Sequence, residues 1–373
     1  MTSTDPGGDA NPYRIAIFFH DLGIGGAERV MLQLAQGFVE SGHPVDLVLA
    51  RAEGPLLAEL PSRVQIVDLK TRSPIQMFFG LISYLREKSP SVLLSPFEVT
   101  SVIAILAKKI TRAPTRIVIR VSVHISQNKR TATWKKTLEQ FVVSRVYPWA
   151  DGIITVSDGV AEDLAVYTKI PLERIKVIYN PVVSEQLLKA AEQPVHHHFF
   201  DESRYPVILS AGRLAEQKDF STLIRAFDVV QKRIPSRLII LGDGEERPHL
   251  ENLIQALGLQ ELVDLPGFNT NPFAFMRKAS MFVLSSKWEG LPGVLIQALA
   301  CGCPVVSTDC LSGPAEILKN GEYGYLVPVG DVDAMANAME MTLMGKIRKP
   351  SKDWLEQFTA RAVIPQYKAV FGI

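Results

Sequence analysis

The sequence has little cysteine, no long apolar run and almost no net charge. Its 373 residues include 3 cysteines, too few for a framework of paired disulfides, so we expect buried free thiols in a reducing compartment. Cys301 and Cys303 straddle one glycine, and no second cysteine or histidine pair stands nearby in sequence to complete a zinc site. A net charge of +1 argues against nucleic acid as the main partner.

Segments for export or membrane insertion are also missing. The first residues, MTSTDPGGDANPYR, are small and polar, and we expect no signal peptide there. The most apolar stretches, IQMFFGLISYL (75–85) and VTSVIAILA (99–107), are far shorter than the roughly 20 residues that a membrane-spanning helix needs. We therefore expect a cytoplasmic protein, with at most a peripheral position on the inner face of a membrane.

What the chain does contain is a regular alternation of short apolar runs and helical patterns, in two series. The first series has runs at 13–20, 43–50, 91–96, 116–123, 152–157 and 175–182, and the second at 207–214, 237–245, 263–268, 281–286, 304–309 and 324–329. Alternating strands and helices favour parallel α/β sheets, and 373 residues is long for a single core. We therefore predict two doubly wound domains.

The break between the two series sets the domain boundaries. Regularity lapses in SEQLLKAAEQPVHHHFFDESRY. We predict a first domain over 1–183, a linker over 184–205, a second domain over 206–350, and a helical segment over 351–373 that can pack back on the first domain. Because ligands of doubly wound sheets sit at the carboxyl ends of the strands, we expect the site in a cleft between the domains.

A glycine-rich turn, DLGIGGAE, follows the first apolar run. Unpaired backbone N–H groups at a helix start attract phosphate, so Gly25 and Gly26 are candidates for approaching a diphosphate. A plain tight turn is the alternative. Glu28 occupies the place of the third glycine in the dinucleotide fingerprint, which leaves NAD binding with little support.

Two cations follow the first strand of the second series. AGRLAEQKDFSTLIRAF (211–227) places Arg213 and Lys218 after a strand and ahead of a helix. Such cations would neutralise a diphosphate, the arginine through its bidentate fork. A solvated charged loop is the alternative interpretation.

A carboxylate stands at the mouth of a helix in SSKWEGLPGVLIQALA (285–300). Glu289 could simply cap that helix. The glycines of GLPG, however, let backbone come close to a ligand, and the helix start behind them can face a phosphate. We therefore expect Glu289 to accept hydrogen bonds from a ligand rich in hydroxyls.

Together these motifs resemble the retaining GT-B glycosyltransferases of glycosyltransferase family 4, over nearly the whole chain and most strongly over 207–330. The resemblance implies two Rossmann-like doubly wound domains facing a central cleft. It also implies transfer of a sugar, with its anomeric configuration retained, from a nucleotide diphosphate-sugar to an acceptor hydroxyl in cell-surface glycan or lipid-linked oligosaccharide assembly. We expect no cofactor beyond this co-substrate, and we identify no metal site of the Asp-x-Asp kind that other transferases use.

The resemblance also assigns roles to individual residues. It implies donor binding by Gly25, Gly26, Arg213, Lys218, Phe268, Glu289, Gly290, Leu291, Pro292, Gly293, Val294 and Gln297. The family's two glutamates, seven residues apart, fall on Glu289, for the donor sugar, and on position 297, for the ribose. His124 matches a histidine beside the reacting sugar, so His124 and Glu289 are the catalytic candidates. The run His196–His198 receives no role, because three consecutive side chains do not share one metal easily.

Position 297 departs from the family pattern, since it is glutamine. An amide can still bond to ribose hydroxyls, so we expect retuned ribose binding rather than lost activity. An inactive donor-binding relative, and a sugar-nucleotide epimerase of the same fold, are the alternatives.

The segment from Lys108 to Arg145 carries ten lysines and arginines and one acid, Glu139. Aromatic and apolar residues stand between them, a composition that suits an anionic membrane surface. The resemblance places the acceptor, a glycan or lipid-linked glycan, in this part of the first domain. A solvated helix face is the alternative.

Overall fold

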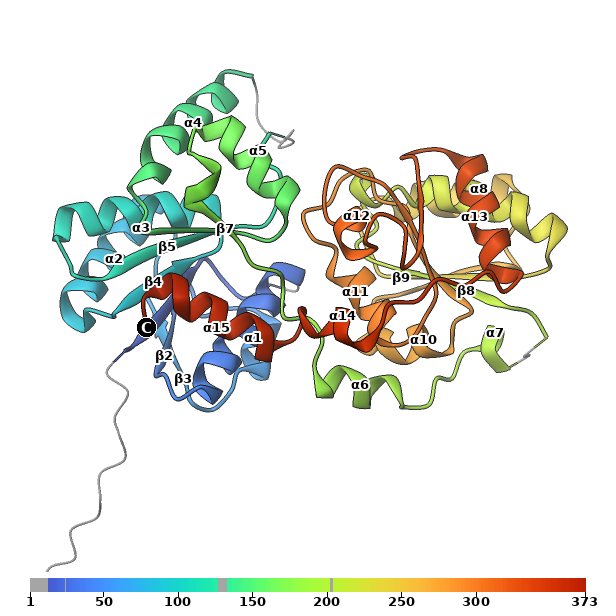
Figure 1. Ribbon diagram of the computed structural model, residues 1–373, viewed down its shortest axis with the longest axis horizontal. Coiled ribbons are helices and arrows are strands. Elements are labelled where there is room, and N and C mark those ends of the chain that lie inside the picture. Colours follow the sequence, from blue (N-terminus) through green and yellow to red (C-terminus); the bar gives the residue numbers. More distant parts are fainter. Residues whose placement is uncertain (1–12, 24, 127–132, 202–203) are drawn as a thin grey trace, which may run out of the picture. The chain divides into compact units, whose positions relative to one another are not determined.

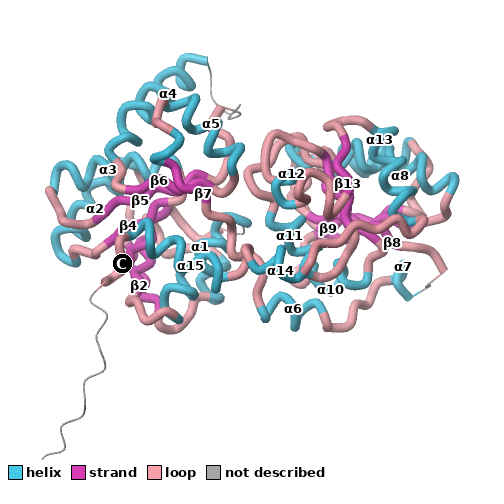
Figure 2. Tube along the Cα trace, viewed as in Figure 1, coloured by secondary structure: helices cyan, strands magenta, loops and turns pink. Residues whose placement is uncertain are grey.

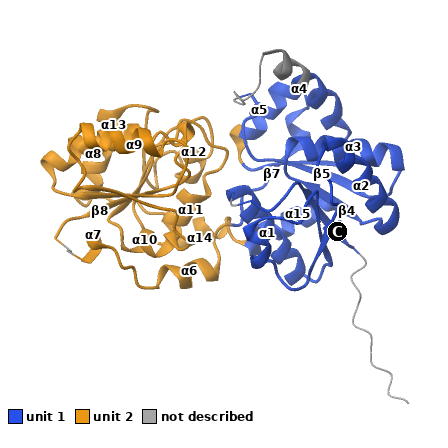
Figure 3. Ribbon diagram, turned by 180° about the vertical axis from the view of Figure 1, so that it is seen from behind, with its two compact units in different colours: residues 1–156, 160–181, 360–373 blue, residues 157–159, 182–359 orange. Residues whose placement is uncertain are grey.

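The computed structural model describes residues 13–23, 25–126, 133–201 and 204–373, with the backbone alone for 133–139. The chain forms two compact units (Figure 3). The first contains residues 1–156, 160–181 and 360–373, and the second contains 157–159 and 182–359. The end of the chain, from Ala360, therefore belongs to the unit in which the chain begins.

The first unit is built on a parallel sheet of seven strands in the order β3-β2-β1-β4-β5-β6-β7. The strands are β1 (Ile15–Phe19), β2 (Val45–Leu49), β3 (Val64–Asp68), β4 (Val92–Ser95), β5 (Arg116–Val121), β6 (Gly152–Thr155) and β7 (Ile175–Val177). Every residue of β1, β2 and β4 is buried. Complete burial of mainly apolar strands is typical of parallel sheets covered on both faces.

Helices cover both faces of this sheet (Figures 1 and 2). Helix α1 (Gly26–Glu40) lies beside α15 (Ala360–Phe371) on one face, and α2 (Pro74–Lys88) lies beside α3 (Glu98–Thr111) on the other. Gly37 allows α1 and α15 to approach closely, since a Cβ there would lie 2.6 Å from the side chain of Ile364. The remaining elements are α4 (Thr133–Val146), α5 (Asp158–Thr168) and the 3-10 turns η1 (Pro55–Glu59), η2 (Tyr147–Trp149) and η3 (Leu172–Arg174).

The second unit contains a parallel sheet of six strands in the order β10-β9-β8-β11-β12-β13. The strands are β8 (Val207–Ala211), β9 (Arg237–Leu241), β10 (Val263–Gly267), β11 (Met281–Leu284), β12 (Val305–Thr308) and β13 (Tyr325–Val327). The helical elements are α6 (Glu185–Ala191), α7 (His198–Asp201), η4 (Glu216–Lys218), α8 (Phe220–Arg233), α9 (Arg247–Ala256), α10 (Pro272–Lys278), α11 (Gly293–Ala300), α12 (Pro314–Ile317), α13 (Val332–Leu343) and α14 (Lys352–Glu356).

A continuous apolar core supports the strands of the second unit. Leu223 and Phe227 of α8 and Met339 of α13 pack with Ile240 and Val283 of the sheet, and all of these side chains are fully buried. Burying each such side chain contributes about 1.5–3 kcal/mol. The loops at the carboxyl ends of the strands are therefore mounted on a rigid base.

The two sheets confirm the predicted fold class, α/β with two doubly wound parallel sheets. Each predicted apolar run contains a strand, but β3 was missed. In β3 only Val64 is buried, while Gln65, Ile66 and Asp68 are exposed, so this edge strand has no apolar run to reveal it. The expected linker, 184–205, carries α6 and α7 in the second unit.

Candidate active site

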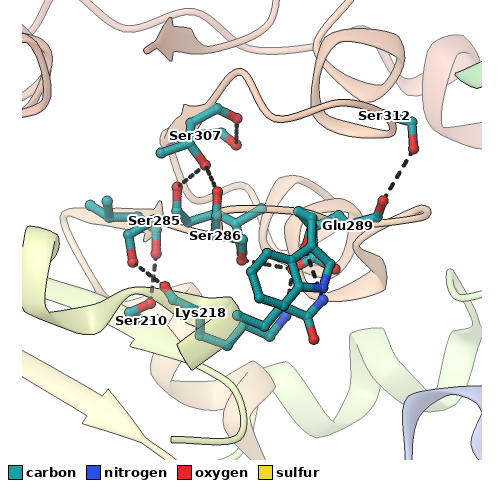
Figure 4. A network of polar contacts seen from close by, with 12 residues as sticks. Ser210, Lys218, Ser285, Ser286, Glu289, Ser307 and Ser312 are labelled. Atoms are coloured by element: carbon teal, nitrogen blue, oxygen red, sulfur yellow. Dashed lines mark hydrogen bonds and ion pairs between the residues drawn. The ribbon is translucent and has the colours of Figure 1, made fainter. Parts of the chain in front are cut away.

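Two loops meet at the carboxyl ends of β8 and β11, which are neighbours in the second sheet. The loop after β8 ends in η4 and carries Lys218, and the loop after β11 carries Glu289. The Nζ atom of Lys218 lies 2.6 Å from Oε1 of Glu289 (Figure 4). Sheet order thus brings together a cation and a carboxylate, both candidates from the sequence, across 71 residues of chain.

This ion pair is largely withdrawn from solvent. The side chain of Lys218 is 17% exposed and that of Glu289 is 9% exposed. The Ser286 hydroxyl donates a second hydrogen bond, of 2.7 Å, to the same oxygen of Glu289. Because buried charges must be paired and hydrogen-bonded to be tolerated, each charge stabilises the position of the other.

Further hydrogen bonds join the two loops. The Ser285 hydroxyl donates to the carbonyl oxygen of Lys218 at 2.7 Å. The Gln217 side chain donates to the Trp288 carbonyl, while the Lys287 N–H donates to the Gln217 carbonyl, each at 2.8 Å. Contacts made through backbone atoms limit how far either loop can move. The geometry of the ion pair is therefore built into the scaffold.

Arg213 lies in the same loop as Lys218 but in different surroundings. Its side chain is exposed and makes no hydrogen bond or ion pair with the residues that the structure describes. Close packing holds the loop base: Gly242, after β9, has a φ of 136°, and a Cβ there would lie 1.9 Å from the carbonyl oxygen of Gly212. Arg213 is therefore an exposed cation at a strand end, where an anion can reach it.

The start of α11 lies directly behind Glu289. Its N-cap residue is Pro292, which provides no side-chain acceptor for the first N–H groups. Gly290 and Leu291 are buried, whereas Gly293 and Val294 are only partly covered. The uncapped positive end of the helix is suited to an anion held by the neighbouring cations.

Gln297 and Phe268 complete the predicted donor residues of this unit. Gln297 lies on α11, half-buried, and its side-chain amide makes no hydrogen bond with the described part of the chain. Phe268 follows β10 and is 57% exposed. Since β10 is the edge strand of the sheet, Phe268 is on a different strand end from Glu289 and Lys218.

The side chain of Glu28 packs against the glycine-rich turn of the first unit. Gly25 is the N-cap of α1, and Gly26 is its first residue. The Glu28 carboxylate lies against Gly25, so that a Cβ on Gly25 would be 2.0 Å from Glu28 Oε2. Burial raises the pKa of Glu28 above its ordinary value, aided by the nearby charge of Asp21 and opposed by a hydrogen bond from the Glu28 backbone. Ile24 lies outside the described residues.

His124 is buried, at 8% exposure, and it has an acidic neighbour. Its Nδ1 atom lies 3.6 Å from Oδ1 of Asp163, on α5. Burial by itself would raise the pKa of Asp163, but hydrogen bonds involving His124 and Ser126 outweigh burial and lower it. Asp163 orients the His124 ring, and sequence reasoning missed it because the two residues lie on different elements.

Not every cation of the basic segment Lys108 to Arg145 is exposed on the surface of the first unit. Lys129 and Arg130 lie outside the described residues, as do the side chains of Lys135 and Lys136. Arg120 is 2% exposed and donates to Tyr367 and Asn180, so it faces the core and belongs to no surface.

Exposed cations do lie beside aromatic rings near both ends of this segment. Lys109 lies 4.6 Å from the ring centre of Trp149, and Arg145 lies 5.3 Å from that of Phe141. Both rings are about half exposed, at 48% and 58%. Among the described residues, no helix has the length and apolar character that crossing a membrane requires.

Two other groups have ligand types that metals use. Asp331-Val332-Asp333 has Asp-x-Asp spacing, but Asp331 caps α13 by accepting from the Ala334 N–H. His197, His198 and Asp264 have ligand atoms within 4.8 Å of one another. However, His197 Nδ1 accepts the Phe199 N–H, and Nε2 lies 3.0 Å from Asp264. Both nitrogens of His197 are thus occupied, and this group is read as a structural hydrogen-bond cluster.

Two doubly wound parallel sheets in separate units of one chain are the architecture of the GT-B fold. Solved structures agree. The lipopolysaccharide outer core galactosyltransferase WaaB aligns with a TM-score of 0.76 at 19% identity, covering 96% of this chain and 99% of that one. Sucrose-phosphate synthase from Thermosynechococcus elongatus aligns with a TM-score of 0.78 at 18% identity, covering 96% and 98%.

Sequence relationships then give the family. The family model described as Glycosyl transferases group 1 matches residues 196–357, and that described as Glycosyltransferase Family 4 matches 24–186. The N-acetylgalactosamine-N,N'-diacetylbacillosaminyl-diphospho-undecaprenol 4-alpha-N-acetylgalactosaminyltransferase of Campylobacter jejuni is 30% identical over 351 residues, covering 91% of this chain and 93% of that protein. The chain therefore belongs to glycosyltransferase family 4, and it is a glycosyltransferase.

Proposed function

We propose that this enzyme transfers an N-acetylhexosamine from a UDP-linked donor to a hydroxyl of a lipid diphosphate-linked glycan, with the anomeric configuration retained. The relative just named acts on a diphospho-undecaprenol substrate. A second N-acetylgalactosaminyltransferase of Campylobacter jejuni, named for a PP-undecaprenol acceptor, is 26% identical over 349 residues. The observation that carries the proposal is the Lys218–Glu289 pair, because it joins a cation suited to a diphosphate with a carboxylate suited to sugar hydroxyls.

The chemistry rests on stabilising the leaving group. As the bond to the donor sugar breaks, negative charge develops on the departing diphosphate. Arg213, Lys218 and the start of α11 supply positive charge and N–H donors for it, and preorganised groups of this kind lower the barrier. These groups take the place that a divalent cation fills in other transferases, so we propose that transfer needs no metal.

Glu289 recognises the sugar in this proposal. A carboxylate only accepts hydrogen bonds, so it suits a ligand whose exposed groups are hydroxyls. Gln297, on α11, bonds to the ribose through its amide. In the first unit, His124 contributes a hydrogen-bonding ring oriented by Asp163 near the reacting sugar, and Gly25 and Gly26 approach the diphosphate.

The acceptor side belongs to the first unit, and we propose that this unit meets an anionic membrane surface. Lys109 and Arg145, together with the half-exposed rings of Trp149 and Phe141, offer charge and apolar area on α3, α4 and η2, which contact one another. Such a combination favours binding to anionic headgroups. The enzyme would then act as a peripheral protein at the inner face of the membrane.

A two-stage experiment tests the proposal. Thermal shift with UDP, GDP, ADP and CMP, each with and without an attached sugar, identifies the donor, and we expect UDP-N-acetylhexosamines to give the largest shifts. Transfer is then measured on a polyprenyl diphosphate-linked disaccharide in EDTA, and NMR of the product gives its anomeric configuration. Three outcomes contradict the proposal: an inverted product, donor bound without transfer, or a donor sugar altered without an acceptor. The last would indicate an epimerase.

A further inference from the structure

Two consecutive serines, Ser285 and Ser286, follow β11. Successive side chains of an extended segment point to opposite sides, and here they reach different partners. The Ser285 hydroxyl donates to the backbone carbonyl of Lys218, whereas the Ser286 hydroxyl donates to the carboxylate of Glu289, each at 2.7 Å (Figure 4). Both serines are almost completely buried, at 1% and 0% exposure.

The two oxygens of the Glu289 carboxylate are used unequally. Oε1 accepts from Lys218 Nζ at 2.6 Å and from the Ser286 hydroxyl at 2.7 Å. Oε2 makes no hydrogen bond with the described residues. Since it is also not among the buried side-chain atoms that lack a partner, solvent can reach it. One oxygen is therefore anchored to the scaffold, and the other is free to accept from a ligand.

We propose that Ser286 is a positioning residue, which fixes the rotation of the Glu289 carboxylate so that Oε2 faces the hydroxyls of the donor sugar. This inference rests on the proposed function. In the proposed function, the Lys218 ammonium can bind either the Glu289 carboxylate or the incoming diphosphate. When Lys218 turns to the diphosphate, the Ser286 hydroxyl remains as the bond that keeps Glu289 in place.

Hydrogen bonds also hold the backbone at both ends of the Ser286–Glu289 contact. Thr308, at the end of β12, donates to the Ser286 carbonyl at 2.7 Å, and Thr308 is fully buried. The Ser312 hydroxyl donates to the carbonyls of Glu289 and Gly290 at 3.1 Å. Because β11 and β12 are hydrogen-bonded neighbours, Thr308 ties the Ser286 end of the contact to the sheet, and Ser312 ties the Glu289 end to the loop that follows β12. The contact is thus preorganised before any donor binds.

The test is Ser286→Ala, with Ser307→Ala as a matched control. Ser307 is also fully buried, on the adjacent β12, but its hydroxyl donates to the Thr308 carbonyl and not to Glu289. Binding of UDP and of UDP-N-acetylgalactosamine is measured by calorimetry for each variant. For Ser286→Ala we expect UDP affinity within about twofold of the wild type, a loss on the order of tenfold in affinity for the sugar nucleotide, and reduced kcat. Ser307→Ala should change neither ligand.

Several results would overturn the inference. Equal losses for UDP and for the sugar nucleotide would indicate a general distortion of the loop, and unchanged binding of both would show that Glu289 needs no such anchor. If Ser286→Ala does not fold, Ser286→Cys carries the test, since a thiol is a weak donor of similar shape, and a selective loss of sugar-nucleotide affinity is again expected. A wild-type enzyme that binds no UDP-sugar would instead contradict the proposed function itself.

Discussion

Glu289 and Lys218 neutralise each other in a place that neither could occupy alone. Their side chains are 9% and 17% exposed, so removing one leaves the other charge poorly solvated, at a cost of about 3–5 kcal/mol for fully buried pairs. The sequence places Glu289 in a loop, where removal of a side chain is ordinarily tolerated by the fold. The structure shows that it is buried, and replacement by a residue of the same shape is therefore the better probe.

We predict that Glu289→Gln lowers turnover by about a hundredfold or more, while UDP binding persists. The amide keeps the shape of the side chain, but it has no negative charge and only one oxygen that can accept hydrogen bonds from sugar hydroxyls. Some loss of thermal stability is expected, because Lys218 remains without its counter-ion. Steady-state kinetics, UDP calorimetry and a melting curve check this, with the exposed Glu216→Gln as control. Turnover near the wild-type value would remove Glu289 from the catalytic site.

Arg213→Ala should weaken UDP binding by about 1.5–3 kcal/mol, the usual worth of a hydrogen bond to a charged group. Because Arg213 is exposed and has no partner among the described residues, its loss should leave stability unchanged. Arg225→Ala is the matched control: Arg225 is exposed on α8, in the same unit. Isothermal calorimetry with UDP separates the two variants. Equal UDP affinity in both would mean that the diphosphate is bound elsewhere.

Gln297→Glu should leave donor binding equal or tighter. A carboxylate accepts from both ribose hydroxyls through charge-assisted bonds, whereas the amide must turn its oxygen toward them. The half-buried amide makes no hydrogen bond with the described residues, so the change breaks no contact of the scaffold. UDP titrations of both forms decide the matter. A marked loss of affinity would show that Gln297 has a structural role instead.

Strand ends, more than individual loops, determine the geometry of the site. β8 lies between β9 and β11, so the loops after these three strands must share limited space. The backbones at Gly212 and Gly242 are in close contact, which leaves no room for a side chain on Gly242. The φ of 136° at Gly242 is also one that residues other than glycine rarely adopt. The path of the Arg213–Lys218 segment thus depends on a glycine after another strand.

Gly242→Ala should therefore separate the loops after β8 and β9. We expect a loss of about 1–3 kcal/mol in the free energy of unfolding, together with weaker UDP binding, because Arg213 is displaced. Gly258→Ala is the control: Gly258 has a φ of 69°, but a Cβ there would meet nothing within 4 Å. That variant should show backbone strain with unchanged UDP affinity. Chemical denaturation and UDP calorimetry compare them, and equal UDP binding in both would contradict the packing argument.

Each unit of the molecule has a complete sheet with its own core, and the chain returns to the first unit to finish it. Helix α15 packs beside α1, where Phe38 contacts the rings of Tyr367 and Phe371. Tyr367 also accepts from the buried Arg120. The C-terminal helix is therefore part of the core of the first unit, and the proposed acceptor and membrane functions belong to a unit that the end of the chain completes.

The first unit should bind anionic vesicles better than neutral ones. Each basic residue near the surface contributes about 1 kcal/mol, and salt should weaken binding because exposed charges are screened within roughly 10 Å. Reversal of Lys109, Arg112 and Arg145 to glutamate, or of Lys129, Arg130, Lys135 and Lys136, should reduce cosedimentation of the full chain and activity on a lipid-linked acceptor.

The matched control for this experiment reverses Arg225, Lys232 and Lys352, which are exposed cations of the second unit. That variant has the same change in net charge as the first set, and we expect it to sediment with vesicles as the wild type does. Equal recovery on neutral and anionic vesicles, or equal effects of the two sets, would indicate a soluble acceptor and a solvated basic face. UDP binding should be unchanged throughout.

Much of this protein can be read along the chain, because secondary structure depends on side chains a few residues apart. Apolar runs such as 13–20 and 281–286 locate buried strands, and the glycines and prolines between them mark turns. The same local patterns placed Arg213 and Glu289 at strand ends. β3 escaped because an edge strand is half exposed and lacks the apolar run.

Only the tertiary structure decided which of these groups meet. Lys218 and Glu289 are brought together because β8 lies beside β11, although β9 and β10 intervene in the chain. Strand order depends on how every helix packs against the sheet, and no local pattern contains it. For the same reason the sequence did not reveal the Ser286–Glu289 hydrogen bond or Asp163 as the neighbour of His124. It also did not reveal that Arg120 is buried, because a buried and an exposed arginine look alike in a sequence.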